Sequence, residues 1–417
     1  MSAAVSDAID LSQAKRAVIT IAGAQAIIGS AAPIAISLGG ITGHYLLGPD
    51  KTLATSPVTG FTLGIALGAI PAAMLMKAFG RRNGFVAGAI VTAIGGGIAC
   101  LSVLQGSFAL FVAALALIGI GGGFVQQYRF AAADVSPVEF KPKAISWVLG
   151  GGVFAAILGP QTVIWTKDLF LPVQFAGAFA ALIVLGIIGA GVLSFLRIPE
   201  DTPENDASDR APQRPLLQII TTPRFLVAFM CAVTAYGLMT FVMTGAPLAM
   251  VLCGFSTDQS TLGISLHVMA MFGPSFVTGH LIKRFGVENI VGAGLLILIT
   301  CTLVAMSGVE LWQFWLALIL LGVGWNFGFI GATAMIATTY NSSEKNKVQG
   351  AHDFVLFSIV AVASLLSGGA LNAFGPSAET GWFWLNLISL PIAIVTLGAL
   401  VFFTLRTKRT GVAAQVS

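Results

Sequence analysis

Three short polar runs interrupt long apolar segments of this sequence, and their side chains are the ones that could do chemistry. The densest run is Gln126-Gln127-Tyr128-Arg129. Its amides can hydrogen-bond a carbonyl or imide edge, and its guanidinium can bind an anionic group. Because a polar side chain within a membrane-spanning helix tends to face the interior or an aqueous cavity, this run is a candidate substrate site. The alternative for Arg129 is an anchor at the cytoplasmic end of its helix.

A second run, Trp325-Asn326, places an indole beside an amide. This pair is suited to stacking on a flat heterocycle and hydrogen-bonding its edge. The alternative is that Trp325 only packs against neighbouring helices. Isolated polar or aromatic residues in other apolar segments extend the candidate set: Gln25, Trp147, Gln161 and Tyr236.

The third run, His352-Asp353, is the candidate for binding and releasing protons. Asp353 lies about five residues inside its apolar segment, which is roughly 8 Å along a helix. A carboxylate there can take up and release a proton in each cycle, and histidine titrates near neutral pH. The alternative is an interfacial pair with Lys345 or Lys347. His267 is a further candidate within an apolar segment, although a buried histidine is often a structural hydrogen-bond donor.

Other kinds of chemistry lack their sequence signatures. We find no paired carboxylates, no His-x-x-x-His, no Gly-x-Ser-x-Gly and no nucleotide-binding loop, so we expect neither an enzyme nor direct use of ATP. No segment resembles a channel selectivity filter. The four cysteines show no metal-ligand spacing, and we expect neither a metal nor a cofactor: Cys100, Cys231, Cys253 and Cys301.

The composition determines which elements must position these residues. The chain has 417 residues, of which 56% are hydrophobic and 9% charged, and its mean hydropathy is +0.92. A soluble domain carries about 25% charged residues. The apolar runs are long enough to cross a bilayer core, for which a helix needs about 20 residues. The sequence therefore predicts an all-α polytopic membrane protein whose first partner is the lipid bilayer.

The apolar runs predict twelve transmembrane helices in two bundles of six. We expect a cytoplasmic tail at 1–16, an N-terminal bundle at 17–196, a linker at 197–223, a C-terminal bundle at 224–405 and a tail at 406–417. The linker is rich in carboxylates, arginine and proline, which predicts a solvated segment. The predicted spans are 17–47, 56–76, 84–104, 107–131, 144–166, 171–196, 224–252, 259–282, 289–307, 311–338, 348–373 and 381–405.

The positions of lysine and arginine predict the orientation. If both termini are cytoplasmic, nineteen of the twenty-one lysines and arginines lie on the cytoplasmic side, and Lys51 and Lys167 are the exceptions. This is the pattern of the positive-inside rule. We expect a protein of the bacterial inner membrane. The net charge of +4 is then explained by the lysines and arginines of the cytoplasmic loops, and it does not indicate nucleic-acid binding.

An internal repeat relates the two halves. Thr62–Leu67 returns as Thr261–Leu266, and Ala32–Ile36 returns as Ala246–Met250, at separations of 199 and 214 residues. Two six-helix bundles repeated in parallel, related by a pseudo-twofold axis along the membrane normal, are the design of transporters that expose a midplane site to each side in turn.

The loop after the second span resembles a motif of the major facilitator superfamily, and the resemblance extends over nearly the whole chain. Gly80, Arg81 and Arg82 match that motif, whereas Lys77 replaces its aspartate. The equivalent loop of the second half carries Lys283, Arg284 and Gly286, again with lysine in place of aspartate. The resemblance implies that these two loops act as cytoplasmic gates.

The resemblance also implies a secondary transporter that moves a small organic solute by alternating access. Gln161 and Thr162 follow Gly159-Pro160, where many antiporters have a glycine pair, and this departure favours uptake. The His352-Asp353 run makes protons the candidate coupling ion. The chain is similar to proteobacterial family members linked to riboflavin uptake, so riboflavin is the first substrate to test. The alternatives are a multidrug or metabolite efflux antiporter and a non-transporting membrane sensor. We expect a monomer.

Overall fold

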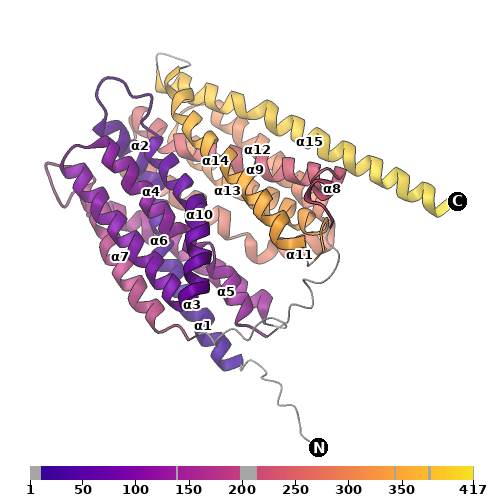
Figure 1. Ribbon diagram of the computed structural model, residues 1–417. Helices are drawn as coiled ribbons and strands as arrows, with labels where there is room; N and C mark the ends of the chain where they lie inside the picture. The colour runs from indigo at the N-terminus through magenta and orange to yellow at the C-terminus, as the bar shows by residue number, and fades with distance from the viewer. Residues whose placement is uncertain (1–10, 138–139, 198–213, 342–343, 374–376, 417) are drawn as a thin grey trace, which may run out of the picture. The chain divides into compact units, whose positions relative to one another are not determined.

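The computed structural model describes residues 11–137, 140–197, 214–341, 344–373 and 377–416. All secondary structure in these ranges is helical (Figure 1). The helices are α1 (Leu11–Ile28), α2 (Ala31–Leu46), α3 (Ser56–Leu104), α4 (Phe108–Val125), α5 (Tyr128–Asp134), α6 (Lys141–Thr166), α7 (Ala176–Ser194), α8 (Leu216–Ile220), α9 (Pro223–Leu252), α10 (Thr257–Phe272), α11 (Ser275–Phe285), α12 (Val287–Met306), α13 (Leu311–Ala337), α14 (Lys345–Ala373) and α15 (Ala378–Val416).

The predicted class of fold is confirmed. Eleven helices among the described residues are long and apolar enough to cross a membrane, and a twelfth span is counted if the bent pair α10–α11 is taken as one. Each of these segments falls on one of the twelve spans predicted from the apolar runs. α1 and α2 together make the first span, and α3 contains the second and third spans, which are joined at Gly80.

The chain divides into two compact units. The first comprises Met1–Ala35 and Leu63–Asp201, and the second comprises Ile36–Thr62 and Thr202–Ser417. The second unit thus takes in the end of α2 and the beginning of α3, which the sequence analysis grouped with the N-terminal bundle. Inside this unit Thr59 Oγ1 lies 3.2 Å from the Ser364 hydroxyl, and Asn372 donates to the Lys51 carbonyl.

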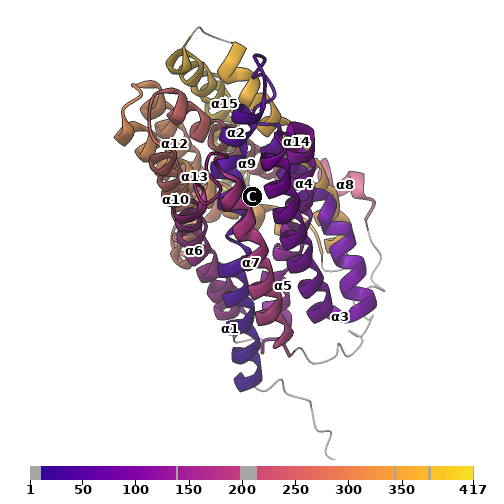
Figure 2. The same cartoon turned by 90° about the vertical axis from the view of Figure 1, so that its left-hand side faces the viewer.

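In the first unit, α1 packs against α5, α6 and α7 (Figure 2). The core between them is apolar, and Phe85 and Tyr128 meet edge to face at 4.9 Å. Glycines bring α3 and α4 very close: a Cβ on Gly68 would lie 2.5 Å from the Ile120 carbonyl oxygen. Small residues therefore provide the close packing on which bilayer helices depend.

In the second unit, α12 and α13 make the most extensive helix–helix contact, and α9 packs against α13, α14 and α15. A Cβ on Gly294 of α12 would lie 2.4 Å from the Gly328 backbone nitrogen of α13 and 2.9 Å from the Gly324 carbonyl oxygen. The two backbones thus touch, and no side chain fits between them.

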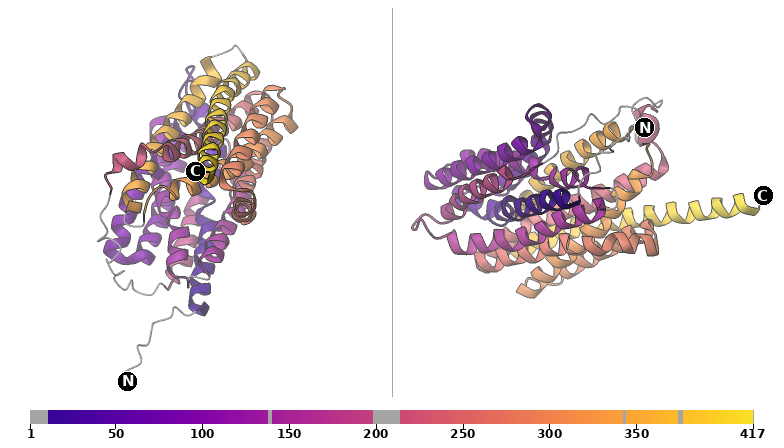
Figure 3. Two further views of the ribbon diagram at one scale, coloured as in Figure 1. Left: turned by 90° about the vertical axis from the view of Figure 1, so that its right-hand side faces the viewer. Right: turned by 90° about the horizontal axis from the view of Figure 1, so that it is seen from below.

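Two elements extend beyond their predicted bounds. α15 continues to Val416, through the segment expected to be a tail, and Figure 3 shows it as one long helix. α1 begins at Leu11 rather than residue 17. Most of the predicted tail at 1–16 and of the predicted linker, residues 1–10 and 198–213, lies outside the described residues.

The described end of the linker is ordered against the second unit. Arg214 donates through its backbone nitrogen and Nε to Glu344 Oε1, each at 2.9 Å, and through Nη2 to Oε2 at 2.7 Å. The Asn341 backbone nitrogen donates to Glu344 Oε2 at 3.0 Å. These donors hold the pKa of the Glu344 carboxyl well below its usual range. Arg214 is therefore held against the second unit, and Leu216–Ile220 forms the short helix α8.

Candidate substrate site

Five aromatic rings from four helices meet in the second unit. Tyr236 of α9 contacts the rings of Trp325 and Phe329 of α13 and Phe357 of α14, with centroids 5.6, 5.0 and 5.6 Å away. Trp325 stacks on Phe329 at 5.3 Å and meets Phe272 of α10 edge to face at 6.4 Å. We call these five residues the aromatic cluster. Their flat faces and edges suit a flat aromatic solute.

Trp325 gives this cluster a polar group. Its side chain is 7% exposed, and among the described residues its indole nitrogen is buried without a hydrogen-bond partner. A buried donor that lacks an acceptor costs about 1–3 kcal/mol, so such a group needs an explanation. A bound solute that accepts a hydrogen bond from this N–H would remove that cost.

The structure places Asn326 differently from its neighbour. It is fully buried, and its Nδ2 donates to the Met271 carbonyl at 2.6 Å and to the Ser275 hydroxyl at 2.7 Å. Its Oδ1 accepts from the Thr278 hydroxyl at 2.6 Å. Both amide hydrogens are therefore engaged within the protein, so Asn326 has no donor left for a solute in this arrangement.

In the first unit, the predicted polar run lies at the break between α4 and α5. Gln126 and Arg129 are exposed and Gln127 is half-buried. Arg129 lies 4.9 Å from the centre of the Phe130 ring. Tyr128, which lies between Gln127 and Arg129 in the sequence, is only 1% exposed and belongs to the apolar core of this unit. The four side chains of this run therefore do not point in the same direction. The two amides and the guanidinium remain accessible, whereas the phenol of Tyr128 packs inside the unit.

The remaining first-unit candidates lie on α1 and α6, which pack together. Gln25 is half-buried beside Gly29 and Gly151. Trp147 is 39% exposed and meets Phe140 edge to face at 5.4 Å. Gln161 is half-buried and directly follows Pro160 in α6. Each of the three side chains therefore keeps part of its surface exposed.

The coupling candidates occupy two places in the second unit. His352 Nδ1 lies 2.8 Å from Asp353 Oδ1, and the His352 ring meets Phe229 edge to face at 5.5 Å. The side chain of His352 is 6% exposed and that of Asp353 60%, so an exposed carboxylate pairs with a buried imidazole. His267 is fully buried, with Nδ1 2.8 Å from the Leu318 carbonyl oxygen. That contact fits the structural alternative weighed for this histidine.

The two loops predicted to act as gates share one backbone feature. Gly80 and Gly286 have φ angles of 79° and 88°, a region that glycine enters without strain. Arg81 forms an ion pair with Asp134 at 2.8 Å. Lys283 and Arg284 lie in the last turn of α11, where cations interact favourably with the helix dipole. Arg82 is exposed, and the side chain of Lys77 lies outside the described part of the structure.

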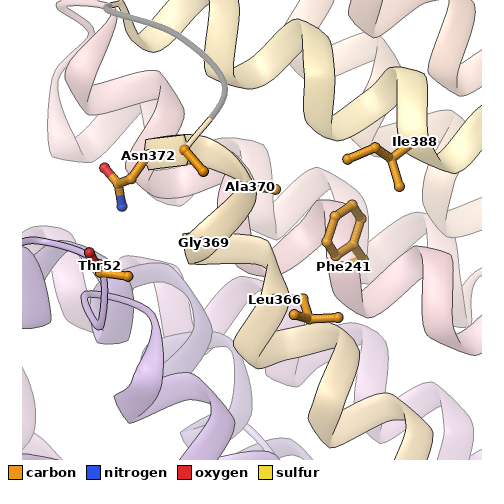
Figure 4. A pocket seen from close by; sticks show the side chains of 8 residues that line it. Thr52, Phe241, Leu366, Gly369, Ala370, Asn372 and Ile388 are labelled. Atoms are coloured by element: carbon orange, nitrogen blue, oxygen red, sulfur yellow. The ribbon is translucent and has the colours of Figure 1, made fainter.

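A separate cavity of about 390 Å³ lies elsewhere in the second unit (Figure 4). Its walls are mainly apolar and come from the loop after α2 and from α9, α14 and α15: Thr52, Phe241, Leu366, Gly369, Ala370, Asn372, Ala373 and Ile388. No residue predicted to bind solute or protons lines it. Among the described residues, no group of three or more metal-binding side chains comes together.

The sequence analysis missed three rings of the aromatic cluster. Phe272, Phe329 and Phe357 are ordinary residues of apolar spans, and the chain has twenty-nine phenylalanines. Phe329 lies four residues after Trp325, which places both rings on one face of a helix. That spacing could have identified Phe329, but no sequence pattern relates α10 and α14 to it.

The number and length of the apolar helices are those of a polytopic membrane protein. The family model of the Major Facilitator Superfamily matches residues 17–358, and the chain belongs to this family of transporters. The chain is also similar to a particular characterised member. It is 45% identical over 406 residues to the riboflavin transporter RfnT of Brucella anthropi, covering 97% of this chain and 99% of that protein.

More distant relatives agree on the fold. The chain is 30% identical over 352 residues to YddS of Bacillus subtilis, an uncharacterised transporter of the same type, covering 80% of this chain and 79% of that one. Among solved structures, a bacterial homologue of the human lysosomal transporter Spinster has a TM-score of 0.70 at 15% identity, covering 95% of this chain and 97% of that chain. That likeness supports the fold alone.

Proposed function

We propose that this transporter carries riboflavin into the cell across the bacterial inner membrane. The observation that carries the proposal is the 45% identity to a riboflavin transporter over 97% of this chain. The match covers almost the full length of both proteins, so it includes every candidate residue of both units. An efflux antiporter, the alternative left open by the sequence, gains no support from this relative.

The aromatic cluster supports the same solute. Riboflavin carries a flat three-ring system with carbonyl groups along one edge. The faces of Trp325 and Tyr236 can contact that ring system, and the buried Trp325 N–H can donate to one of its carbonyl oxygens. The accessible first-unit candidates for further polar contacts remain predictions: Gln25, Gln126, Gln127, Arg129, Trp147 and Gln161.

We further propose that uptake is coupled to protons as symport. The His352–Asp353 pair supports this, because it joins two titratable groups at 2.8 Å within a span. Intramembrane titratable residues commonly mark proton pathways in transporters. His267 is the second candidate, although its contact with the Leu318 carbonyl favours a structural role.

Growth of a riboflavin auxotroph tests the substrate. Cells that cannot synthesise flavin and that express this chain should grow at low external riboflavin, whereas cells with the empty vector should not. Insertion is verified by quantifying the chain in isolated inner membranes. Absence of growth despite verified insertion would remove riboflavin, and resistance to several unrelated drugs would favour efflux instead.

A further inference from the structure

The span formed by α10 and α11 is broken at Gly273-Pro274, where the two helices differ in direction by 42°. Proline has no backbone N–H, so it cannot donate to the carbonyl four residues before it, and it kinks or breaks a helix. A break inside a span leaves carbonyl groups that must find other donors, because lipid offers none.

Asn326 supplies that donor from a different helix. Its Nδ2 donates to the carbonyl of Met271, in the last turn of α10, and to the hydroxyl of Ser275, the first residue of α11. Its Oδ1 accepts from Thr278, one turn further along α11. One side chain of α13 therefore bonds both sides of the break.

α11 has few other buried contacts. Every residue of α11 is described, and Thr278 is its one buried side chain. That buried side chain is the residue that donates to Asn326. α11 also carries Lys283 and Arg284 into the gate loop at Gly286. The amide of Asn326 is thus the buried polar connection between α13 and the helix that bears this loop.

From these contacts we infer that Asn326 is a positioning residue: it fixes the break of this span and ties α11 to α13. In this role Asn326 does not touch the solute. It sets the direction of α11 and thereby the position of the gate loop, so that the loop follows α13 during the transport cycle. Trp325 and Asn326 are then adjacent residues with different roles. Trp325 binds the solute, and Asn326 positions the two helices on either side of the break.

The first test is hydrogen–deuterium exchange of the full-length protein without any solute. Asn326→Ala removes three buried hydrogen bonds, so we expect the amides of residues 275–285 to exchange at least about tenfold faster, the factor that one lost bond of about 1.4 kcal/mol already gives. Thr278→Val removes one of the three bonds with little change of shape, and it should give a smaller increase in the same segment. If Asn326→Ala does not fold, exchange in Thr278→Val still tests whether the contact with Asn326 positions α11.

Asn386→Ala is the matched control. Asn386 is another fully buried asparagine of the second unit, but its amide donates to the Trp382 carbonyl of its own helix. This variant should leave exchange at 275–285 unchanged. Unchanged exchange there in both Asn326→Ala and Thr278→Val would overturn the inference.

The second test separates positioning from binding, and it alone rests on riboflavin being the solute. For Asn326→Ala we expect the maximal uptake rate to fall by about tenfold while the dissociation constant for riboflavin stays within twofold of the parent. A weakened affinity with an unchanged rate would instead make Asn326 a solute ligand. If the parent binds no riboflavin, the proposed substrate is wrong, and the exchange experiment still decides the role of Asn326.

Discussion

At the scale of single residues, the decisive contrast is between Trp325 and Asn326. Successive residues of a helix point about 100° apart, so neighbours in sequence face different surroundings. Asn326 satisfies its amide within the protein, whereas the buried N–H of Trp325 has no partner among the described residues. The sequence showed two side chains suited to a heterocycle. Only the contacts in the structure show that the Trp325 N–H has no partner among the described residues while the Asn326 amide is engaged within the protein.

Trp325→Phe should weaken riboflavin binding about tenfold, because it removes the N–H while keeping an aromatic ring; this corresponds to one hydrogen bond of about 1.4 kcal/mol. Quenching of riboflavin fluorescence on the purified protein measures the affinity. Trp312→Phe is the control, because this tryptophan of the same helix is 55% exposed and donates to Glu310 Oε2. Equal affinities in parent and Trp325→Phe would place the solute elsewhere.

Asp353→Asn should abolish accumulation of riboflavin against its gradient while preserving exchange of labelled for unlabelled solute. The amide can still accept a hydrogen bond from His352, but it cannot carry a proton. Uptake into membrane vesicles with and without a protonophore measures both activities. Asp168→Asn, at a surface pair with Lys167, is the control. Accumulation that survives in Asp353→Asn would move this carboxylate to a structural role.

At the scale of elements, apolar run length and charge predicted the spans well, because the bilayer imposes one length on every spanning helix. The breaks were not foreseen. Gly273-Pro274 lies inside a predicted span, and nothing local shows that a distant asparagine satisfies the break. The anchor at Glu344 was missed for the same reason, since its partner Arg214 lies 130 residues earlier. Run length and charge along the chain therefore predict where helices cross the bilayer. They do not predict which distant side chains form hydrogen bonds with each other.

Gly294→Ala should destabilise the second unit by about 1–3 kcal/mol, the usual cost of overpacking. The added methyl would lie 2.4 Å from the Gly328 nitrogen, and a backbone cannot rotate away as a side chain can. Gly292→Ala, on the same helix, is the control, because its Cβ would meet only side-chain carbons at 3.9 Å. Thermal unfolding in detergent measures both. Equal midpoints for the two variants would contradict close backbone packing between α12 and α13.

The Glu344 anchor has a defined pH dependence. The pKa of its carboxyl is lowered in the folded protein by Arg214 and by the Asn341 N–H, so its contribution to stability is complete above the ordinary carboxyl value of 4.5. That contribution decreases only as pH falls from there towards the lower folded value. The difference in thermal midpoint between the parent and Glu344→Gln should therefore be constant from about pH 8 to 5.5 and shrink below about 4.5.

Glu288→Gln is the control for this series. Glu288 pairs with Arg224 at 3.1 Å, and both side chains are partly exposed, so its loss should cost less than loss of the buried Glu344. A difference between parent and Glu344→Gln that already changes between pH 7 and 6 would contradict the anchor, because no carboxyl with a lowered pKa titrates there.

At the scale of the whole molecule, the positions of lysine and arginine and the number of spans both determine on which side of the membrane each loop and terminus lies. The two cations expected outside have local partners in the structure. Lys51 donates to the His44 and Leu47 carbonyl oxygens at 2.6 Å each, and Lys167 pairs with Asp168 at 2.6 Å. Their positions are therefore explained by hydrogen bonding at helix ends, and they do not weaken the orientation inferred from the other nineteen.

The parity of the spans gives the last prediction. If α10 and α11 together cross the membrane once, the chain has twelve spans and both termini lie in the cytoplasm; if this pair does not cross, the eleven remaining spans place the C-terminus outside. Alkaline phosphatase, active only outside, should therefore be active when fused after Gly48 and inactive when fused after Gly286 or at the C-terminus. A fluorescent protein should give the opposite pattern. Phosphatase activity both after Gly286 and at the C-terminus would show that the bent pair does not span, and the repeat of two six-helix bundles would fail with it.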